Sequence, residues 1–320
     1  MRSRFVFAFS GMAVLLAVPI AGATSPGHNG RVAFMRKDQQ DHWQIWTASP
    51  RLTGAKKLTS GGADSGYAVW SPDGSKLAFD SARTDPNPND SKKLNDVFVM
   101  DADGTGVKRL TQSGFNADPA WSPDGSLIAF DSDRGAYPAQ QGIYVMRSDG
   151  SDVRRITTLP AGFQNDLAPR FSPDGRELVF TRYRGQNATE KAALFMVRLD
   201  GMSLRQLSSF AIHAGDADWS PDGSRIVFEA YPNPRSFGDV YVIGANGRNQ
   251  RNLTRNPLGQ AGSADPVWSP DGTKILFLDN RRVSGRGRTG LATIRPDGRR
   301  RAFISTKSIE AHQPDWESVH

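Results

Sequence analysis

The chain has 320 residues, of which 38% are hydrophobic and 23% charged, with 32 glycines and 20 prolines. This balance is typical of a soluble globular protein, and so much glycine and proline favours many tight turns over long helices. The chain has no cysteine, which excludes disulfides, thiolate metal sites and a cysteine nucleophile; its net charge of +7 is too modest to indicate nucleic-acid binding.

The first segment predicts export. Two arginines precede an apolar run over residues 5–20, and Ala21-Gly22-Ala23 is a small-residue cleavage pattern. We interpret residues 1–23 as a signal peptide and residues 24–320 as the mature chain, periplasmic or secreted. An uncleaved anchor is the alternative, although a membrane span needs about 20 residues and this run is shorter. No other segment is apolar enough to cross a membrane.

The start of the mature chain predicts three short strands, rich in apolar and β-branched residues: Arg31–Phe34, Gln44–Trp46 and Lys57–Thr59. A repeat of about fifty residues then begins. Its signature, Trp70-Ser71-Pro72-Asp73-Gly74, returns at Trp121, Phe171, Trp219 and Trp268, at steps of 51, 50, 48 and 49 residues. A further step of 48 residues reaches Trp316, in a truncated form of the signature. Such regular self-similarity indicates a repeat architecture.

Each repeat predicts four strands. The aromatic residue ends strand A, and Ser-Pro-Asp-Gly forms a turn in which proline presets φ and glycine takes the positive φ. In the first full repeat, strand B is Leu77–Phe79 and strand C is Val97–Met100. Asp103-Gly104 is a tight hairpin signal before strand D, Arg109–Thr111. Four antiparallel strands in fifty residues are typical of a β-propeller blade.

The two ends of the chain complete the blade count. The first unit has strands B, C and D but no strand A, whereas the C-terminus offers an unmatched strand A, Gln313–Trp316. We therefore predict an all-β, six-bladed propeller of four-stranded antiparallel blades, with the C-terminal strand joining the N-terminal blade to close the ring. Closure removes the open sheet edges that promote aggregation.

The stretch Asp118-Pro119-Ala120-Trp121-Ser122-Pro123-Asp124-Gly125, with Ile128–Phe130 and Tyr144–Met146 downstream, resembles the propeller repeat of the TolB family. The resemblance covers essentially the whole mature chain and implies the fold. Family members include the periplasmic TolB protein of the Tol–Pal envelope system and propellers fused to peptidases. TolB proper carries an α/β domain before its propeller, while about seven residues separate the cleavage site from the first strand here. The resemblance therefore implies a TolB-like propeller without that domain.

The position three residues before each repeat aromatic is expected to face the central channel. It holds Tyr67, Asp118, Ala168, Asp216, Asp265 and Gln313. Convergent aspartates predict a negative channel mouth that binds a basic segment of an envelope protein or peptide, with Gln313, His213 and His312 contributing. Calcium, held by Asp118, Asp216 and Asp265, is a second candidate ligand. Alternatively, the aspartates begin strand A and bond only to nearby backbone.

The sequence shows no catalytic constellation: it has no Gly-x-Ser-x-Gly, His-Glu-x-x-His or phosphate loop, and its five histidines lack ligand spacing. We predict a non-catalytic, monomeric binding or scaffold propeller of the cell envelope that needs no cofactor. Its partner would bind at the channel mouth and on the face with the variable B–C and D–A loops. The alternative is a channel-mouth lyase or hydrolase that acts on polysaccharide or peptide through Asp216, His213 and His312.

Overall fold

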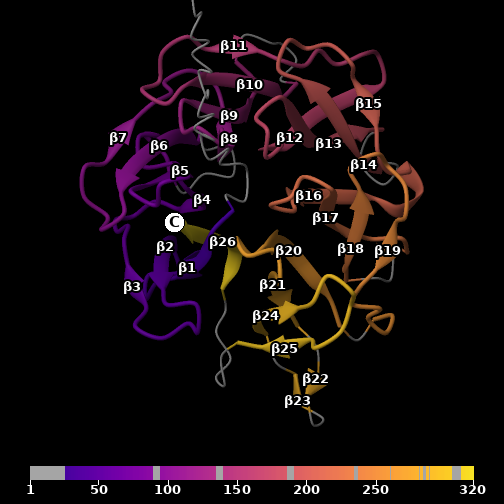
Figure 1. Ribbon diagram of the computed structural model, residues 1–320. Coiled ribbons are helices and arrows are strands. Elements are labelled where there is room, and N and C mark those ends of the chain that lie inside the picture. The colour runs from indigo at the N-terminus through magenta and orange to yellow at the C-terminus, as the bar shows by residue number, and fades with distance from the viewer. Residues whose placement is uncertain are drawn as a thin grey trace, which may run out of the picture.

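The computed structural model describes residues 26–88, 94–134, 140–185, 191–233, 237–259, 261–280, 282–283, 286–287, 289–304 and 311–320. Six four-stranded antiparallel sheets surround a central axis, which confirms the predicted propeller (Figure 1). The predicted signal peptide, residues 1–23, lies outside the described residues. In the part of the chain that the structure describes, no helix has the length and apolar character needed to cross a membrane.

In every blade the strands follow one another from the axis outward. Blade 1 contains β26 (His312–Val319), β1 (His28–Lys37), β2 (Trp43–Ala48) and β3 (Lys56–Lys57); blade 2 contains β4 (Ser65–Trp70), β5 (Lys76–Ser81), β6 (Asp96–Asp101) and β7 (Lys108–Arg109); blade 3 contains β8 (Asn116–Trp121), β9 (Leu127–Ser132), β10 (Gly142–Arg147) and β11 (Arg154–Arg155). Blade 4 contains β12 (Phe163–Phe171), β13 (Glu177–Arg184), β14 (Lys191–Arg198) and β15 (Arg205–Gln206); blade 5 contains β16 (Ala214–Trp219), β17 (Arg225–Ala230), β18 (Asp239–Gly244) and β19 (Arg251–Asn252); blade 6 contains β20 (Ser263–Trp268), β21 (Ile275–Asp279), β24 (Gly290–Ile294) and β25 (Ala302–Phe303).

Two short elements were not predicted. A hairpin of β22 (Arg282–Val283) and β23 (Arg286–Gly287) extends from blade 6, and a 3₁₀-helix spans Phe210–Ile212 before β16.

The Ser-Pro-Asp-Gly turns hold the inner two strands of a blade together. In blade 5, the Ser220 hydroxyl donates to Asp222 Oδ1 at 2.6 Å and accepts from the Arg225 backbone N–H at 2.9 Å. Gly223 closes the turn with φ of 68°, a left-handed conformation that glycine adopts at little cost. The repeat signature is therefore a hydrogen-bonded turn that connects the two inner strands of a blade, as its composition predicts.

Substituting Ser220 by alanine should remove the hydrogen bonds that its hydroxyl makes to Asp222 and to the Arg225 backbone. We expect the free energy of unfolding to fall by about 1–2 kcal/mol, because each such bond contributes roughly 0.5–1.5 kcal/mol. Urea denaturation would measure the loss. Ser151→Ala is the matched control: this serine bonds Asp149 in an exposed turn on the propeller rim, so its removal should cost less.

The interiors of the blades are packed around the second strand. Its phenylalanine is fully buried in blades 2 to 6 and almost fully in blade 1; these residues are Phe34, Phe79, Phe130, Phe180, Phe228 and Phe277. The repeat tryptophans pack between blades, as Trp121 of blade 3 does with Val69 and Ala78 of blade 2. Their recurrence therefore reflects the fold.

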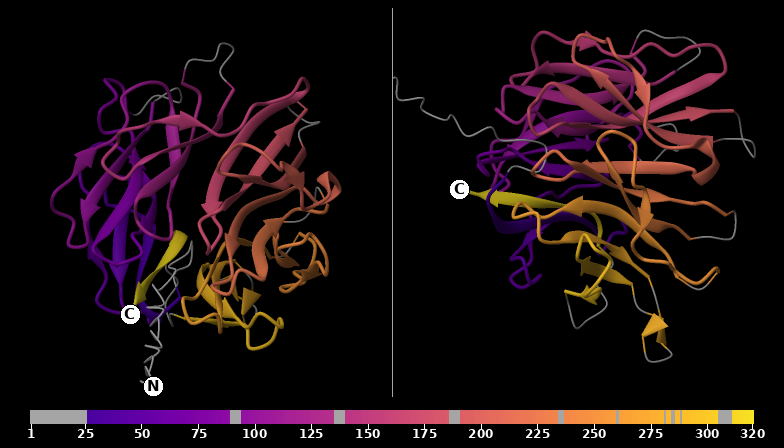
Figure 2. Two further views of the ribbon diagram at one scale, coloured as in Figure 1. Left: turned by 45° about the horizontal axis from the view of Figure 1, so that its top comes forward. Right: turned by 45° about the vertical axis from the view of Figure 1, so that its right-hand side comes forward.

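The C-terminal strand closes the ring. β26 lies beside β1 and pairs with it antiparallel, so the two chain ends share blade 1 (Figure 2). Arg31 binds Glu317 with two side-chain hydrogen bonds of 2.7 and 2.9 Å, and its backbone N–H donates to the same carboxylate at 2.8 Å. Asp315 Oδ2 accepts from the Trp70 backbone N–H of blade 2 at 2.8 Å. The predicted closure is confirmed.

Candidate functional site in the central channel

The innermost strands share a bulge around the channel. The residue three before each repeat aromatic has φ between 43° and 52°: these residues are Tyr67, Asp118, Ala168, Asp216, Asp265 and Gln313. The register with the neighbouring strand shifts at the same place, as between Gly215 and Asp218 in blade 5. A bulge leaves one residue unpaired and redirects its side chain. This distortion brings one residue from each of the six blades to the axis.

The backbone conformation accounts for only part of the aspartate preference. A left-handed conformation is several-fold enriched in aspartate and asparagine, whose short polar side chains bond local backbone. Yet Tyr67, Ala168 and Gln313 adopt the same φ in their blades. The left-handed turn therefore tolerates other residues, and the aspartates need a further explanation.

Carboxylates link one blade to the next beside the channel. The Asp265 backbone N–H donates to Glu229 Oε2 of the preceding blade at 3.1 Å, and the Gln313 N–H donates to Asp265 Oδ2 at 3.1 Å. Equivalent but longer bonds run from Asp118 N–H to Asp80 at 3.5 Å and from Ala168 N–H to Asp131 at 3.4 Å. These carboxylates thus bond backbone N–H groups of the following blade, whereas the alternative expected each aspartate to bond only the backbone near it.

Sequence reasoning missed Asp80, Asp131 and Glu229. Each follows directly after the buried phenylalanine of the second strand, thirteen residues after the channel position of the same blade. Their signal is an acidic residue at a fixed repeat position on a strand that is otherwise apolar. Asp80, Asp131 and Glu229 are all buried and form a second layer behind Asp118, Asp216 and Asp265. We call these two layers together the acidic ring.

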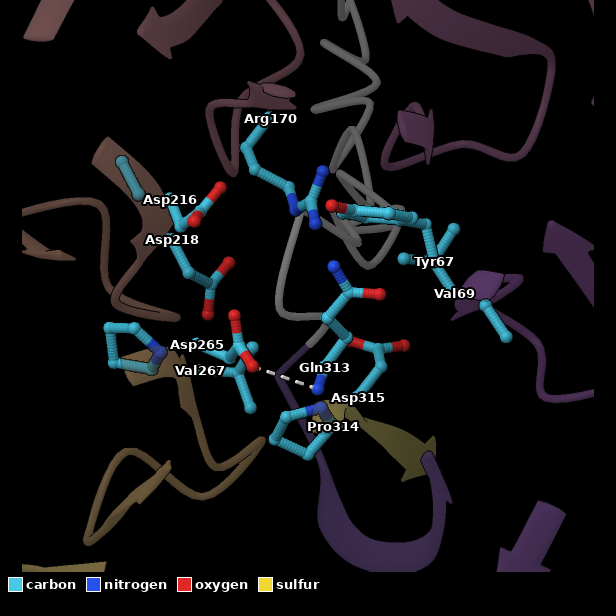
Figure 3. A pocket seen from close by; sticks show the side chains of 13 residues that line it. Tyr67, Val69, Arg170, Asp216, Asp218, Asp265, Val267, Gln313, Pro314 and Asp315 are labelled. Carbon is cyan, nitrogen blue, oxygen red and sulfur yellow. Dashed lines mark hydrogen bonds between the residues drawn. The ribbon is translucent and has the colours of Figure 1, made fainter. Parts of the chain in front are cut away.

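The inner strands enclose a small cavity of about 30 Å³ that opens to solvent. Asp216, Asp218 and Asp265 approach it from blades 5 and 6, while Gln313 and Asp315 approach from β26 (Figure 3). Its other described lining residues are Tyr67, Ala68, Val69, Arg170, Ala217, Pro266, Val267 and Pro314. Among all these lining residues, Arg170 alone carries a positive charge. The cavity is therefore strongly acidic.

Burial and mutual repulsion raise the pKa values of these carboxyl groups. Burial, reinforced by the charge of Asp216, raises the pKa of Asp118 to about 6 and that of Asp265 to about 7. Burial and the nearby Asp218 raise the pKa of Asp315 to about 7. The pKa of Glu229 lies well above its ordinary value, because the side chain is buried and faces Asp216 and Asp265. The ring therefore takes up protons near neutral pH.

Asp216, Glu229 and Asp265 form the group best placed to hold a cation. One carboxylate oxygen from each lies within 4.8 Å of the other two. Thus Glu229, rather than the expected Asp118, joins the two aspartates. Asp118 Oδ1 and Gln313 Oε1 are buried near this group without a hydrogen-bond partner. Carboxylate and amide oxygens are the ligands that calcium prefers, so the donor set fits calcium.

The two histidines predicted at the mouth lie on different aromatic groups. His213, in the left-handed conformation with φ of 47°, packs edge-on against Tyr231 at 6.1 Å and Tyr183 at 6.2 Å between ring centroids. His312 packs edge-on against Trp43 at 5.0 Å. The Tyr231 hydroxyl donates to Glu229 Oε1 at 3.1 Å, which connects the His213 side of the mouth to the acidic ring.

Comparisons with known proteins agree with this architecture. Residues 159–289 match the family model described as the TolB beta propeller domain. The uncharacterized protein Atu1656 of Agrobacterium fabrum is 31% identical over 192 residues, which cover 57% of this chain and 60% of that protein. The uncharacterized peptidase YuxL of Bacillus subtilis is 26% identical over 194 residues, which cover 50% of this chain and only 28% of the peptidase.

A solved structure extends the fold match. TolB from Acinetobacter baumannii superimposes with a TM-score of 0.71 at 21% identity, over 92% of this chain and 68% of that one. The match to TolB therefore covers nearly all of this chain at the level of the fold.

Proposed function

We propose that this chain, a TolB-like β-propeller, is an exported, non-catalytic binding module of the cell envelope. Its acidic channel receives a basic segment of a partner protein or peptide. Residues 1–23 support export, because their composition is that of a signal peptide. The relatives include an uncharacterized protein and a peptidase, so the activity is argued from the channel itself.

The observation that carries this proposal is the unbalanced charge of the channel. Asp216, Asp265 and Asp315 line one cavity in which Arg170 is the sole basic residue among the described lining. Keeping such carboxylates close together is unfavourable unless a cation or a basic group compensates them. Oδ1 of Asp118, whose carboxyl group also contacts that of Asp131, accepts no hydrogen bond from the described donors, so acceptor capacity remains there. A lysine or arginine side chain would satisfy it.

Replacing Asp118, Asp216 and Asp265 together by asparagine should weaken binding of an arginine-rich peptide at least tenfold. Asparagine preserves size and can still accept the backbone bond at Gln313, while three charges are lost. A tenfold change corresponds to about 1.4 kcal/mol, modest beside the 2–5 kcal/mol of a desolvated charge contact. Fluorescence anisotropy at pH 8 and physiological ionic strength would measure it, because the raised pKa values leave the ring less charged at lower pH.

The matched control removes three other aspartates, Asp101, Asp152 and Asp200, which form exposed ion pairs away from the channel. This triple asparagine variant should bind the peptide as the parent does. Equal losses in both variants would show that the peptide senses only overall charge. Unchanged binding in the channel variant, together with an unchanged effect of calcium on the melting temperature, would refute a channel site. Turnover of polysaccharide or peptide that depends on Asp216 and His213 would favour a lyase or hydrolase instead.

A further inference from the structure

Two arginines of blade 5 lie along its boundary with blade 6. Arg225 begins β17 and Arg251 begins β19, and the strand register places both side chains on the face that packs against blade 6. Arg225 stacks on Trp268 of blade 6, 4.9 Å from the ring centroid, and Arg251 donates to Pro296 O of the same blade at 3.1 Å. Both lie at the turn end of the blade, by which we mean the end with the Ser-Pro-Asp-Gly turn and the turn between β18 and β19.

The other blades compensate basic side chains at their turn ends. In each of blades 1 to 4, such a side chain pairs with an acid of the same blade; the pairs are Arg31–Glu317, Lys76–Asp101, Arg147–Asp152 and Arg205–Glu177. The four acids come from four different positions of the repeat. At these positions blade 5 holds, in the same order, Ser220, Gly244, Asn249 and Arg225. Blade 5 therefore has the basic side chains without an acid at any of the four positions.

The surroundings do not supply the missing acid. Neither Arg225 nor Arg251 forms an ion pair with a carboxylate of the residues that the structure describes. Asp222, in the turn before β17, instead accepts from the hydroxyls of Ser220 and Ser224. The four equivalent positions of blade 6 hold Ser269, Lys274, Arg295 and Arg300. The turn end of blade 5 is therefore a place of uncompensated positive charge.

Arg225 and Arg251 line a surface hollow of about 330 Å³. The other residues that line it are Ser224, Val242, Ile243, Gly244, Asn246 and Asn249. Gly244 brings no side chain to this hollow, whereas blade 2 has Asp101 at the same position of the register. The volume is at the lower end of the roughly 300–1,000 Å³ that is usual for small-ligand sites. The hollow thus combines room for a ligand with two cationic groups.

We propose that this blade 5 hollow binds a carboxylate group, supplied by an aspartate or glutamate of a partner peptide. A carboxylate is the group that the chain itself provides at the turn ends of blades 1 to 4. Guanidinium groups bind carboxylates through paired N–H donors, and Arg225 is already held in place by its stacking on Trp268. The hollow is larger than one carboxylate, and the amides of Asn246 and Asn249 offer partners for peptide backbone. These features favour a peptide over a free acid.

The hollow is separate from the acidic channel. It is formed by the three outer strands of blade 5 and the turns between them, whereas the innermost strands line the channel cavity. The inference therefore does not rest on the proposed function, and it stands even if the channel binds no partner. If both sites are used, one partner can present an acidic residue to the hollow and a basic segment to the channel.

An NMR titration of the ¹⁵N-labelled full-length chain at pH 7 tests the proposal. The end-blocked peptide Gly-Glu-Gly-Glu-Gly should shift the Nε–H signals of Arg225 and Arg251, and should bind at least fivefold more tightly than Gly-Gln-Gly-Gln-Gly. Arg225→Gln with Arg251→Gln should weaken binding at least fivefold. Asn249→Asp should weaken it similarly, because it places a carboxylate inside the hollow, as Asp152 does at this position of blade 3. Aspartate tolerates the left-handed φ of 59° there.

The matched control is Lys76→Gln with Lys108→Gln, since these lysines hold the equivalent positions of blade 2 beside Asp101. This variant should bind the peptide as the parent does. Equal losses in the control would overturn the proposal, as would equal binding of the two peptides. Asn249→Asp keeps both arginines and their contacts, so it decides the question if the arginine variant is unstable; parent-like binding by it would refute the site.

Two small anions identify the source of the carboxylate. Succinate should bind at least fivefold more weakly than the glutamate peptide, because it offers no backbone to the amides of the hollow. Succinate that binds as tightly as the peptide would assign the hollow to a free acid. Phosphate that binds more tightly than either would overturn a carboxylate site.

Discussion

Lowering the pH from 8 to 5 should stabilise this protein by several kcal/mol. Asp118, Asp265 and Asp315 have folded-state pKa values of about 6, 7 and 7, all above their ordinary value of 3.8. The folded protein therefore binds more protons than the unfolded chain between about pH 4 and 7, so stability is lost as the pH rises through these values. Thermal and urea unfolding at both pH values would measure the change.

The interval from pH 5 to 8 separates the channel carboxyl groups from the aspartates of the turns. Turn aspartates such as Asp73 and Asp222 have lowered pKa values, through hydrogen bonds from serine hydroxyls and backbone N–H groups. Their contribution is lost only below about pH 4, because the unfolded carboxyl titrates there. A protein that becomes more stable from pH 5 to 8 would contradict the raised values in the channel.

Asp265→Asn should reproduce the effect of acid at a single position. The asparagine oxygen can still accept from the Gln313 N–H, while the repulsion with Asp216 disappears. Since one pKa unit corresponds to about 1.4 kcal/mol, we expect a gain of up to about 4 kcal/mol at pH 8 and little gain at pH 5. Asp101→Asn is the control, because this exposed aspartate pairs with Lys76 and its loss should be slightly destabilising. A destabilised Asp265→Asn at pH 8 would show that its charge is compensated in the folded state.

The repeat allowed most of the fold to be predicted, because each element has a local cause. Glycine closes the turns, and alternating apolar residues mark the strands. Asp118, Asp216 and Asp265 could be placed at the axis since every blade repeats the same backbone. Glu229 was missed because strand B was followed only as far as its phenylalanine. Its proximity to the aspartates also depends on blade 5 meeting blade 6, which periodicity within a blade does not reveal.

The arginines of the last blade show the same limit. The sequence places a run of arginines in the last blade, yet it does not show that Arg251 of blade 5 lies against Pro296 of blade 6. Nor does it distinguish Arg301, which is bound to Asp279, from its exposed neighbours. Contacts between blades connect residues nearly fifty positions apart in the chain. Such contacts, more than the strands themselves, assemble the channel site.

Deleting residues 312–320 should abolish the cooperative unfolding transition of the propeller. The deletion removes β26, leaves β1 as an unpaired inner edge, and exposes Phe34 and Val32, which pack with Trp316. Losing one buried tryptophan costs about 3–5 kcal/mol, and the lost strand pairing and the Asp315–Trp70 bond add to it. The total approaches the 5–15 kcal/mol by which folded domains are stable. Calorimetry and size-exclusion chromatography would reveal a partly unfolded, aggregating species.

Two further experiments test whether the loss of the cooperative transition comes from the missing strand β26. Glu317→Gln keeps β26 but weakens its pairing with Arg31, and should cost only about 1 kcal/mol because Arg31 is 40% exposed. A synthetic peptide of residues 312–320 added to the deletion variant should restore part of the transition, since it supplies the missing inner strand. A deletion variant that melts like the parent would mean that five complete blades and three strands suffice. The channel cavity would then lose Gln313 and Asp315 without loss of the fold. Closure of the ring by β26 would in that case matter only for binding of a partner.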